Sequence, residues 1–236
     1  MSKQAIQAKT AKGNERPILF SGSMVRAILE DRKTVTRRPV KGGQTPTEDA
    51  AGNDGGPRWS AIGQRHPRYG YCVFGETEAE CAQELAERGV CPYGRPGDRL
   101  WVREVWVADA QVNAVAPRDL SQGEPIRYPA DGGARQTGCA MITPGKSRPS
   151  IHMPRWASRI LLEITTVRVE RLQDISEEQA LAEGIAKHPG GGHHVEDGKH
   201  YWASPIDSFA GLWSSVGGDW DANPWVWVVE FRRVQP

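Results

Sequence analysis

The sequence predicts an α+β fold, in which a bent and mainly antiparallel β-barrel is flanked by short helices and carries two large loop insertions. Runs rich in β-branched and aromatic residues at 16–20, 99–106, 160–172 and 225–234 are typical of strands. Short amphipathic stretches with capping residues lie between them and predict helices. In the third run the apolar residues change from even-numbered to odd-numbered positions. This change indicates the bulge or bend that a closed or strongly coiled sheet requires.

The length of 236 residues suits one domain, which we expect to cover residues 16–236 after a polar, disordered tail at residues 1–15. Two stretches depart from strand and helix patterns. One covers about residues 42–70 and begins with a segment rich in Gly, Thr, Asp and Pro. The other covers about residues 108–150 and is rich in Gly, Pro and Gln. Both are expected to be irregular insertions.

The first strand is expected at residues 16–20, and Ser21 is placed to cap the helix that follows. The helix carries apolar residues at helical spacing. Thr34, Val35 and Thr36 then favour an extended chain because their side chains are stiff at χ1 or crowd a helix. The helix should therefore end near residue 32 or 33.

The middle of the chain is expected to add a strand and a helix. The 71–90 stretch predicts a strand followed by a helix at residues 78–88. Turn residues at 91–98 lead into the next strand. In the 160–172 strand, the change of parity places the predicted bulge near Thr165 and Thr166.

The last third begins with a capping box, in which Ser176 and Gln179 predict a helix over residues 176–183 and Gly184 ends it. Pro205 opens a further helix with apolar residues along one stripe. The closing strand at 225–234 is expected to turn every second side chain inward. The inward side chains are Trp225, Trp227, Val229 and Phe231.

The charge pattern excludes a general polyanion binder. The formal net charge is only +1, so any contact with nucleic acid must be local. Six basic residues against two acidic ones lie between Met24 and Lys41, which forms such a local patch. The N-terminus lacks the apolar core of a signal peptide, and no later apolar run is long enough to span a bilayer. We therefore expect a cytoplasmic protein that does not bind membranes.

The cysteine and histidine positions predict no metal and no other cofactor. The four cysteines contain no C-x-x-C pair, so unpaired buried thiols are favoured over a metal site assembled from distant loops. Four histidines in a Gly-rich loop have no defined ligand geometry and are expected at the surface. These residues are Cys72, Cys81, Cys91 and Cys139, and His188, His193, His194 and His200.

Several separate features together resemble the ASCH domain, a family related to the PUA-like β-barrels. They are the helix ending in Arg32-Lys33-Thr34-Val35-Thr36-Arg37, the Gly97-Asp98 turn before a strand, the capping-box helix at 175–184 and the closing Trp-Val-Val-Glu-Phe strand. The Cys91-Pro-Tyr-Gly and Ile151-His-Met-Pro-Arg-Trp156 segments resemble the long versions carried by bacteriophages and prophages. The resemblance implies a PUA-like barrel encoded by a phage or prophage and located in the bacterial cytoplasm.

The resemblance also implies a basic cleft for RNA, a modified nucleoside or a modified base. Some bacterial members of the family are amidohydrolases that remove the acetyl group from N4-acetylcytidine. They use a Lys and a Thr in a Lys-x-x-Thr stretch and a Glu on the capping-box helix. Those positions correspond here to Lys33, Thr36 and Glu183. One expectation is therefore hydrolysis of an N4-acylated cytidine or a related nucleoside.

These residue types can support that chemistry, which needs a nucleophile, a proton acceptor and a donor for the oxyanion. We expect a lowered pKa for Lys33, so that it acts as a base toward Thr36 or water, while Glu183 orients the attacked group or passes the proton on. Residues three apart face opposite sides of a strand, so Lys33 must lie on the helix end or in the turn. The basic and aromatic side chains expected to bind substrate are Arg26, Arg37, Arg38, Tyr128, His152, Arg155 and Trp156.

Three alternatives stay open at this point. Basic residues near a helix end are often a solvated surface that interacts favourably with the helix dipole. The same cleft would serve a non-catalytic module that binds nucleic acid. The insertions would also suit a phage accessory or morphogenesis factor that acts through contacts with unidentified proteins.

Overall fold

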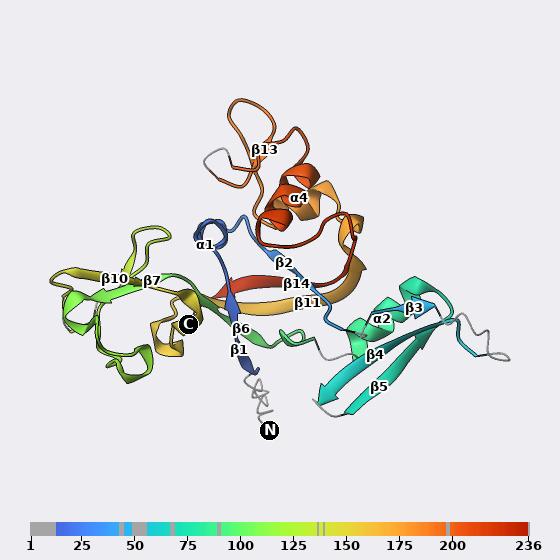
Figure 1. Ribbon diagram of the computed structural model, residues 1–236, viewed down its shortest axis with the longest axis horizontal. Helices are drawn as coiled ribbons and strands as arrows, with labels where there is room; N and C mark the ends of the chain where they lie inside the picture. The colour runs from blue at the N-terminus through green and yellow to red at the C-terminus, as the bar shows by residue number, and fades with distance from the viewer. Residues whose placement is uncertain are drawn as a thin grey trace, which may run out of the picture.

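The computed structural model describes residues 13–42, 45–48, 56–66, 69–88, 91–135, 137–138, 140–196 and 199–235, without the side chains of residues 64–66 and 69 (Figure 1). The strands are β1 (Glu15–Leu19), β2 (Val35–Pro39), β3 (Thr47–Glu48), β4 (Trp59–His66), β5 (Tyr69–Gly75), β6 (Arg99–Arg103), β7 (Trp106–Asp109), β8 (Ile126–Arg127), β9 (Ala134–Arg135), β10 (Pro144–Arg148), β11 (Leu161–Arg171), β12 (Ala186–Lys187), β13 (His193–His194) and β14 (Trp225–Val234). The α-helices are α1 (Gly22–Leu29), α2 (Glu78–Arg88), α3 (Glu177–Ala182) and α4 (Pro205–Ser215). Among the described residues, no helix has the length and apolar character needed to cross a membrane.

The fold is α+β and mainly antiparallel, but the described strands do not close into the expected barrel. The central sheet has the order β1-β6-β11-β14-β2, in which only the β1–β6 pair is parallel. β1 and β2 lie at opposite edges, so α1 crosses the sheet between them (Figure 1). The expected bulge is confirmed, because the register of β11 against β14 shifts between Ile164 and Thr166.

Both faces of the central sheet are covered, which the expected alternation in β14 did not foresee. The predicted inward residues of β14 lie in one core cluster together with residues of α1 and α2. Val226 and Val228, on the opposite parity, are also fully buried, because Phe209, Leu212 and Trp213 of α4 pack over them. The sheet is therefore the middle layer between two sets of helices, and its core is divided between the two faces.

The described parts of the two predicted insertions contain strands, where irregular loops were expected. The first insertion contributes β3 and β4, which form a three-stranded sheet with β5 that packs on α2. β5 is the strand expected in the 71–90 stretch. In the second, β7, β8, β9 and β10 form a four-stranded sheet with its own small core around Trp106 and Tyr128. Figure 1 shows the two small sheets on opposite sides of the central sheet. β3, β7, β8, β9 and β10 have two to five residues and β4 contains a glycine, so their periodicity is weak.

The predicted tail lies mostly outside the described residues, but its last residues are ordered. Glu15 belongs to β1, where it pairs with Arg99. The backbone N–H of Asn14 donates to Asp98 Oδ1 over 3.0 Å. The ordered domain therefore begins earlier than expected.

The helix boundaries place the candidate residues. α1 ends at Leu29, a few residues earlier than expected, and Asp31 takes a left-handed φ of 56° that turns the chain out of the helix. The capping box of α3 is confirmed, with Ser176 at the N-cap, Glu183 at the C-cap and Gly184 at φ +103° as the stop. Lys33 thus lies in the turn between α1 and β2, as its proposed partnership requires.

We predict that Gly184→Ala destabilises the fold by about 1–3 kcal/mol, because alanine is strained at positive φ. A Cβ there would also lie 3.1 Å from the Ala27 Cβ, so α1 must shift. Gly132→Ala is the matched control, since Gly132 has φ +76° and a Cβ added there would meet no neighbouring atom within 4 Å. Urea unfolding should show a larger loss for Gly184→Ala. Equal losses would contradict the predicted contact with α1.

Candidate functional site

The Lys33 side chain is fully buried and makes three hydrogen bonds. Its Nζ donates to Glu183 Oε2 over 2.6 Å, to the Glu183 carbonyl over 2.9 Å and to the Val35 carbonyl over 2.8 Å. The ring of Phe20 lies 5.6 Å away and receives the ammonium on its face. Three acceptors match the three N–H groups of a protonated lysine.

Glu183 receives a second cation from β2. Arg37 Nη1 donates to Glu183 Oε1 over 3.3 Å, and Arg37 Nη2 donates to Gln179 Oε1 over 2.8 Å. Glu170 of β11 lies 3.6 Å from the same guanidinium. The carboxylate is therefore held by two buried cations from different elements, which compensates for the desolvation of its charge.

A cavity of about 230 Å³ lies beside this cluster. One wall is polar and comes from β2 and the end of α3, with Thr36, Arg38 and Glu183 among its residues. The facing wall is apolar; its residues are Met24, Phe209, Leu212, Trp213 and Val216. Lys33 is absent from the lining and lies behind Glu183.

Thr36 and Arg38 both line the cavity. Thr36 is buried, and no hydrogen bond of its hydroxyl is found among the described residues. Arg38 donates to the Leu19 carbonyl over 2.8 Å and lies 5.6 Å from the Phe20 ring centre. Its remaining N–H groups can meet an anion or a carbonyl oxygen.

The electrostatics of the cluster depend on burial. Burial lowers the pKa of Lys33 from its ordinary value, and the carboxylate of Glu183 opposes this change. Arg38 and Arg37 add to the lowering because they are like charges. The free-energy cost of desolvating Lys33 and Glu183 is thus offset by the short, charge-assisted hydrogen bond between them.

The other residues expected to bind substrate are not brought to this cavity. Tyr128 is buried and donates its hydroxyl to the Ala157 carbonyl over 2.8 Å. Arg155 pairs with Glu15 at 2.8 Å, and Arg135 stacks 5.3 Å from the Trp156 ring centre. His152 lies in a short 3₁₀ helix beside them. These side chains belong to the lobe formed by the second insertion.

Arg26, another residue expected to bind substrate, makes contacts that hold the fold together. It forms an ion pair with Glu196 and donates to the Ala130 carbonyl. It therefore ties α1 to the His-rich segment and to the lobe of the second insertion.

Sequence reasoning missed the apolar wall and two polar neighbours of the cluster. Gln179 was recognised as a capping residue, but the same oxygen that accepts from the Ser176 amide also accepts from Arg37. Glu170 of β11 reaches Arg37 of β2 across the one strand between them, β14. The stripe of Phe209 and Trp213 was visible as a helix face, but nothing local indicates that this face also borders a cavity.

The described residues contain no cluster of three or more His, Cys, Asp or Glu suited to a metal ion. His188 packs edge-on against His194 at 4.9 Å and against Tyr201 at 5.1 Å. Cys81 and Cys91 are buried free thiols, whereas Cys72 is a free thiol that is exposed. Cys139 lies outside the described residues.

Comparison with family models, with curated proteins and with solved structures finds no match for this chain.

We predict a pH dependence for the buried pair. The unfolded chain has an ordinary lysine pKa of 10.5, and the folded value is lower. Between these two values the unfolded state binds the extra proton, so folding stability falls as the pH drops through this window. Lys33→Met removes this term, so the stability difference between wild type and variant should grow as the pH rises toward 10.5.

Urea unfolding at stepped pH values measures this difference. Lys146→Met is the control, because Lys146 is an exposed lysine on β10. Parallel pH profiles for wild type and Lys33→Met would contradict a lowered pKa at Lys33.

Proposed function

We propose that this protein is an ASCH-type nucleoside-binding hydrolase that removes the acyl group from an N4-acylated cytidine or a related modified nucleoside. The observation that carries the proposal is that Thr36 and Glu183 both line one small cavity. The resemblance of the Lys33 to Arg37 stretch and of the α3 helix to that family supports the same residues. A phage or prophage origin and a bacterial cytoplasmic location belong to this proposal as well.

The cavity suits a flat, uncharged heterocycle. Its apolar wall from α4 can cover the face of a base, while the polar residues Thr36, Arg38 and Glu183 line the other side. The nearby cations already have partners, since Lys33 and Arg37 both contact Glu183. Their charge stabilises Glu183 and is not free to bind a phosphate.

The proposed reaction begins with attack of the Thr36 oxygen on the acyl carbon, while its proton passes to the Glu183 carboxylate. The amide C–N bond then breaks, the proton goes to the departing amine nitrogen, and the acyl group stays on Thr36 as an ester. Water hydrolyses the ester, releases the carboxylic acid and restores the hydroxyl. Arg38 would donate to the oxyanion that forms in both steps.

We assign proton acceptance to Glu183 instead of Lys33. The three acceptors around Lys33 Nζ are satisfied by an ammonium, which has no lone pair to accept a proton. Lys33 is thus a positioning residue that fixes the Glu183 carboxylate at 2.6 Å. The alternative function is a module that binds a nucleoside or nucleic acid without chemistry. The arrangement also favours this alternative, because the hydrogen bonds of Lys33 and Glu183 are satisfied and would serve to hold the wall of a binding cavity in place.

We predict that Thr36→Val lowers turnover of N4-acetylcytidine by at least about a hundredfold, because valine keeps the shape but lacks the nucleophile. Thr36→Ser should retain measurable turnover. Mass spectrometry of cytidine formation gives the rate, and thermal unfolding confirms that each variant is folded. Alanine at Lys33 or Glu183 is less informative, since it leaves the other charge buried without its partner.

The outcomes separate the two functions. Wild-type protein that binds the nucleoside in the cavity without forming product would favour the non-catalytic alternative. Full activity in Thr36→Val would exclude Thr36 as the nucleophile. A wild type that neither binds nor turns over N-acylated nucleosides would overturn both.

A further inference from the structure

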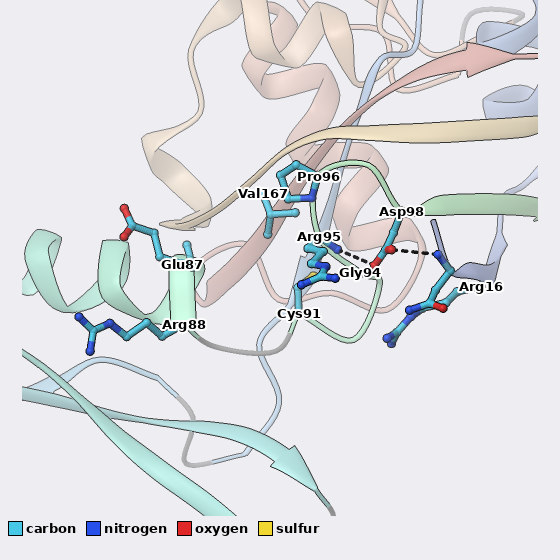
Figure 2. Close-up of a pocket in the computed structure, with 11 residues that line it drawn as sticks. Arg16, Glu87, Arg88, Cys91, Gly94, Arg95, Pro96, Asp98 and Val167 are labelled. Carbon is cyan, nitrogen blue, oxygen red and sulfur yellow. Dashed lines mark hydrogen bonds between the residues drawn. The ribbon is translucent and has the colours of Figure 1, made fainter. Parts of the chain in front are cut away.

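A second cavity, of about 460 Å³, lies where three segments distant in the sequence meet (Figure 2). Its walls come from the start of β1, the end of α2 and the turn at residues 91–98, with Val167 of β11 at its base. It shares no lining residue with the cavity beside Thr36. An inference about it is therefore independent of the proposed function.

This cavity carries positive charge that lacks a carboxylate partner. Figure 2 shows Arg95 and Arg16 on the side of the turn and of β1, with the end of α2 on the other side. Within the described part of the chain, the Arg95 guanidinium has neither an ion pair nor a hydrogen bond. Arg16 donates only to the neutral carbonyl of Pro92, over 3.0 Å.

The carboxylates that line the cavity do not contact these arginines. Asp98 is buried, and its two oxygens accept the backbone N–H groups of Asn14 at 3.0 Å and Arg95 at 3.2 Å. Burial raises the pKa of the Cys91 thiol to about 11, so this group is uncharged at neutral pH. Glu87 accepts a hydrogen bond from Gln83 on its own helix. The guanidinium groups of Arg16 and Arg95 are therefore not held by a described carboxylate, although Asp98 and Glu87 keep their own charge.

The cavity continues into a second hollow of about 540 Å³ between α2 and β11, with which it shares Ala86, Glu87 and Val167. In that hollow the arginines are paired, Arg168 with Glu170 at 2.6 Å and Arg171 with Glu78 at 2.7 Å. Its floor includes the apolar side chains Ala82, Val169 and Trp225. The two adjacent hollows together form a groove, with unpaired arginines in one part and apolar surface in the other.

We propose that this groove binds a nucleotide, with its phosphate between Arg16 and Arg95 and its base along α2 and β11. Two guanidinium groups provide the charge-assisted donors that a phosphate ester needs. The volumes fall in the range of small-molecule sites, about 300–1,000 Å³. The phosphate can come from a free mononucleotide or from the backbone of a single-stranded nucleic acid, which share this chemistry.

The test compares Arg95→Gln and Arg16→Gln with Arg118→Gln. Arg118 is a suitable control because it is highly exposed and does not line the groove, so the change in net charge is matched. Cytidine 5′-monophosphate and a short single-stranded oligonucleotide are titrated separately at low salt. Affinity for the bound probe should fall about tenfold in Arg95→Gln and Arg16→Gln and stay within about twofold in Arg118→Gln.

For the oligonucleotide, the slope of log affinity against log salt should also decrease by about one in Arg95→Gln. Loss of mononucleotide binding identifies the free nucleotide as the ligand, and loss of oligonucleotide binding alone identifies the nucleic-acid backbone. Equal losses in all three variants, no loss in Arg95→Gln, or no binding by wild type would overturn the proposal. Sensitivity to Thr36→Val without sensitivity to Arg95→Gln would place the ligand in the other cavity and overturn it too.

Discussion

The buried contact between Lys33 and Glu183 joins three elements that are far apart in the chain. The Lys33 turn follows α1, Glu183 caps α3, and Arg37 of β2 completes the cluster. Backbone bonds reinforce it, because the N–H of Thr34 donates to the Ala182 carbonyl over 2.9 Å. A charge pair taken out of water is stable only when its remaining donors and acceptors are satisfied. The positions of α1, β2 and α3 are consequently interdependent, and so is the wall that Thr36 presents to the cavity.

Local signals in the sequence predicted the elements that carry this cluster. The capping box at Ser176, the glycine stop at Gly184 and the bulge after Ile164 each depend on a few neighbouring residues, and all are confirmed. The closing strand was placed correctly for the same reason, since large apolar residues fill it. What failed was the inference that only one parity of that strand is buried, because covering the second face depends on where α4 packs.

The candidate site was predictable as a set of residues but not as an arrangement. The Lys33 turn was deduced from geometry, and the structure places it outside β2. The two small sheets were not foreseen as sheets, although β5 falls in the stretch where a strand was predicted. Most of their other strands have only two to five residues, which leave little periodicity to read. The aromatic and basic residues of the second insertion looked suited to a ligand for their chemistry. They lie in a separate lobe, where guanidinium groups stack on rings as part of the packing.

The two cavities differ in whether the cations beside them already have protein partners. The basic stretch after α1 seemed suited to an anion, but Arg32 pairs with Glu30, and Lys33 and Arg37 both contact Glu183. Cations already held by protein acceptors add little attraction for phosphate, so a ligand beside Thr36 must bind mainly through shape and directional hydrogen bonds. That requirement favours an uncharged base. At Arg95 the situation is reversed, because an unpaired guanidinium keeps its full capacity for an anion.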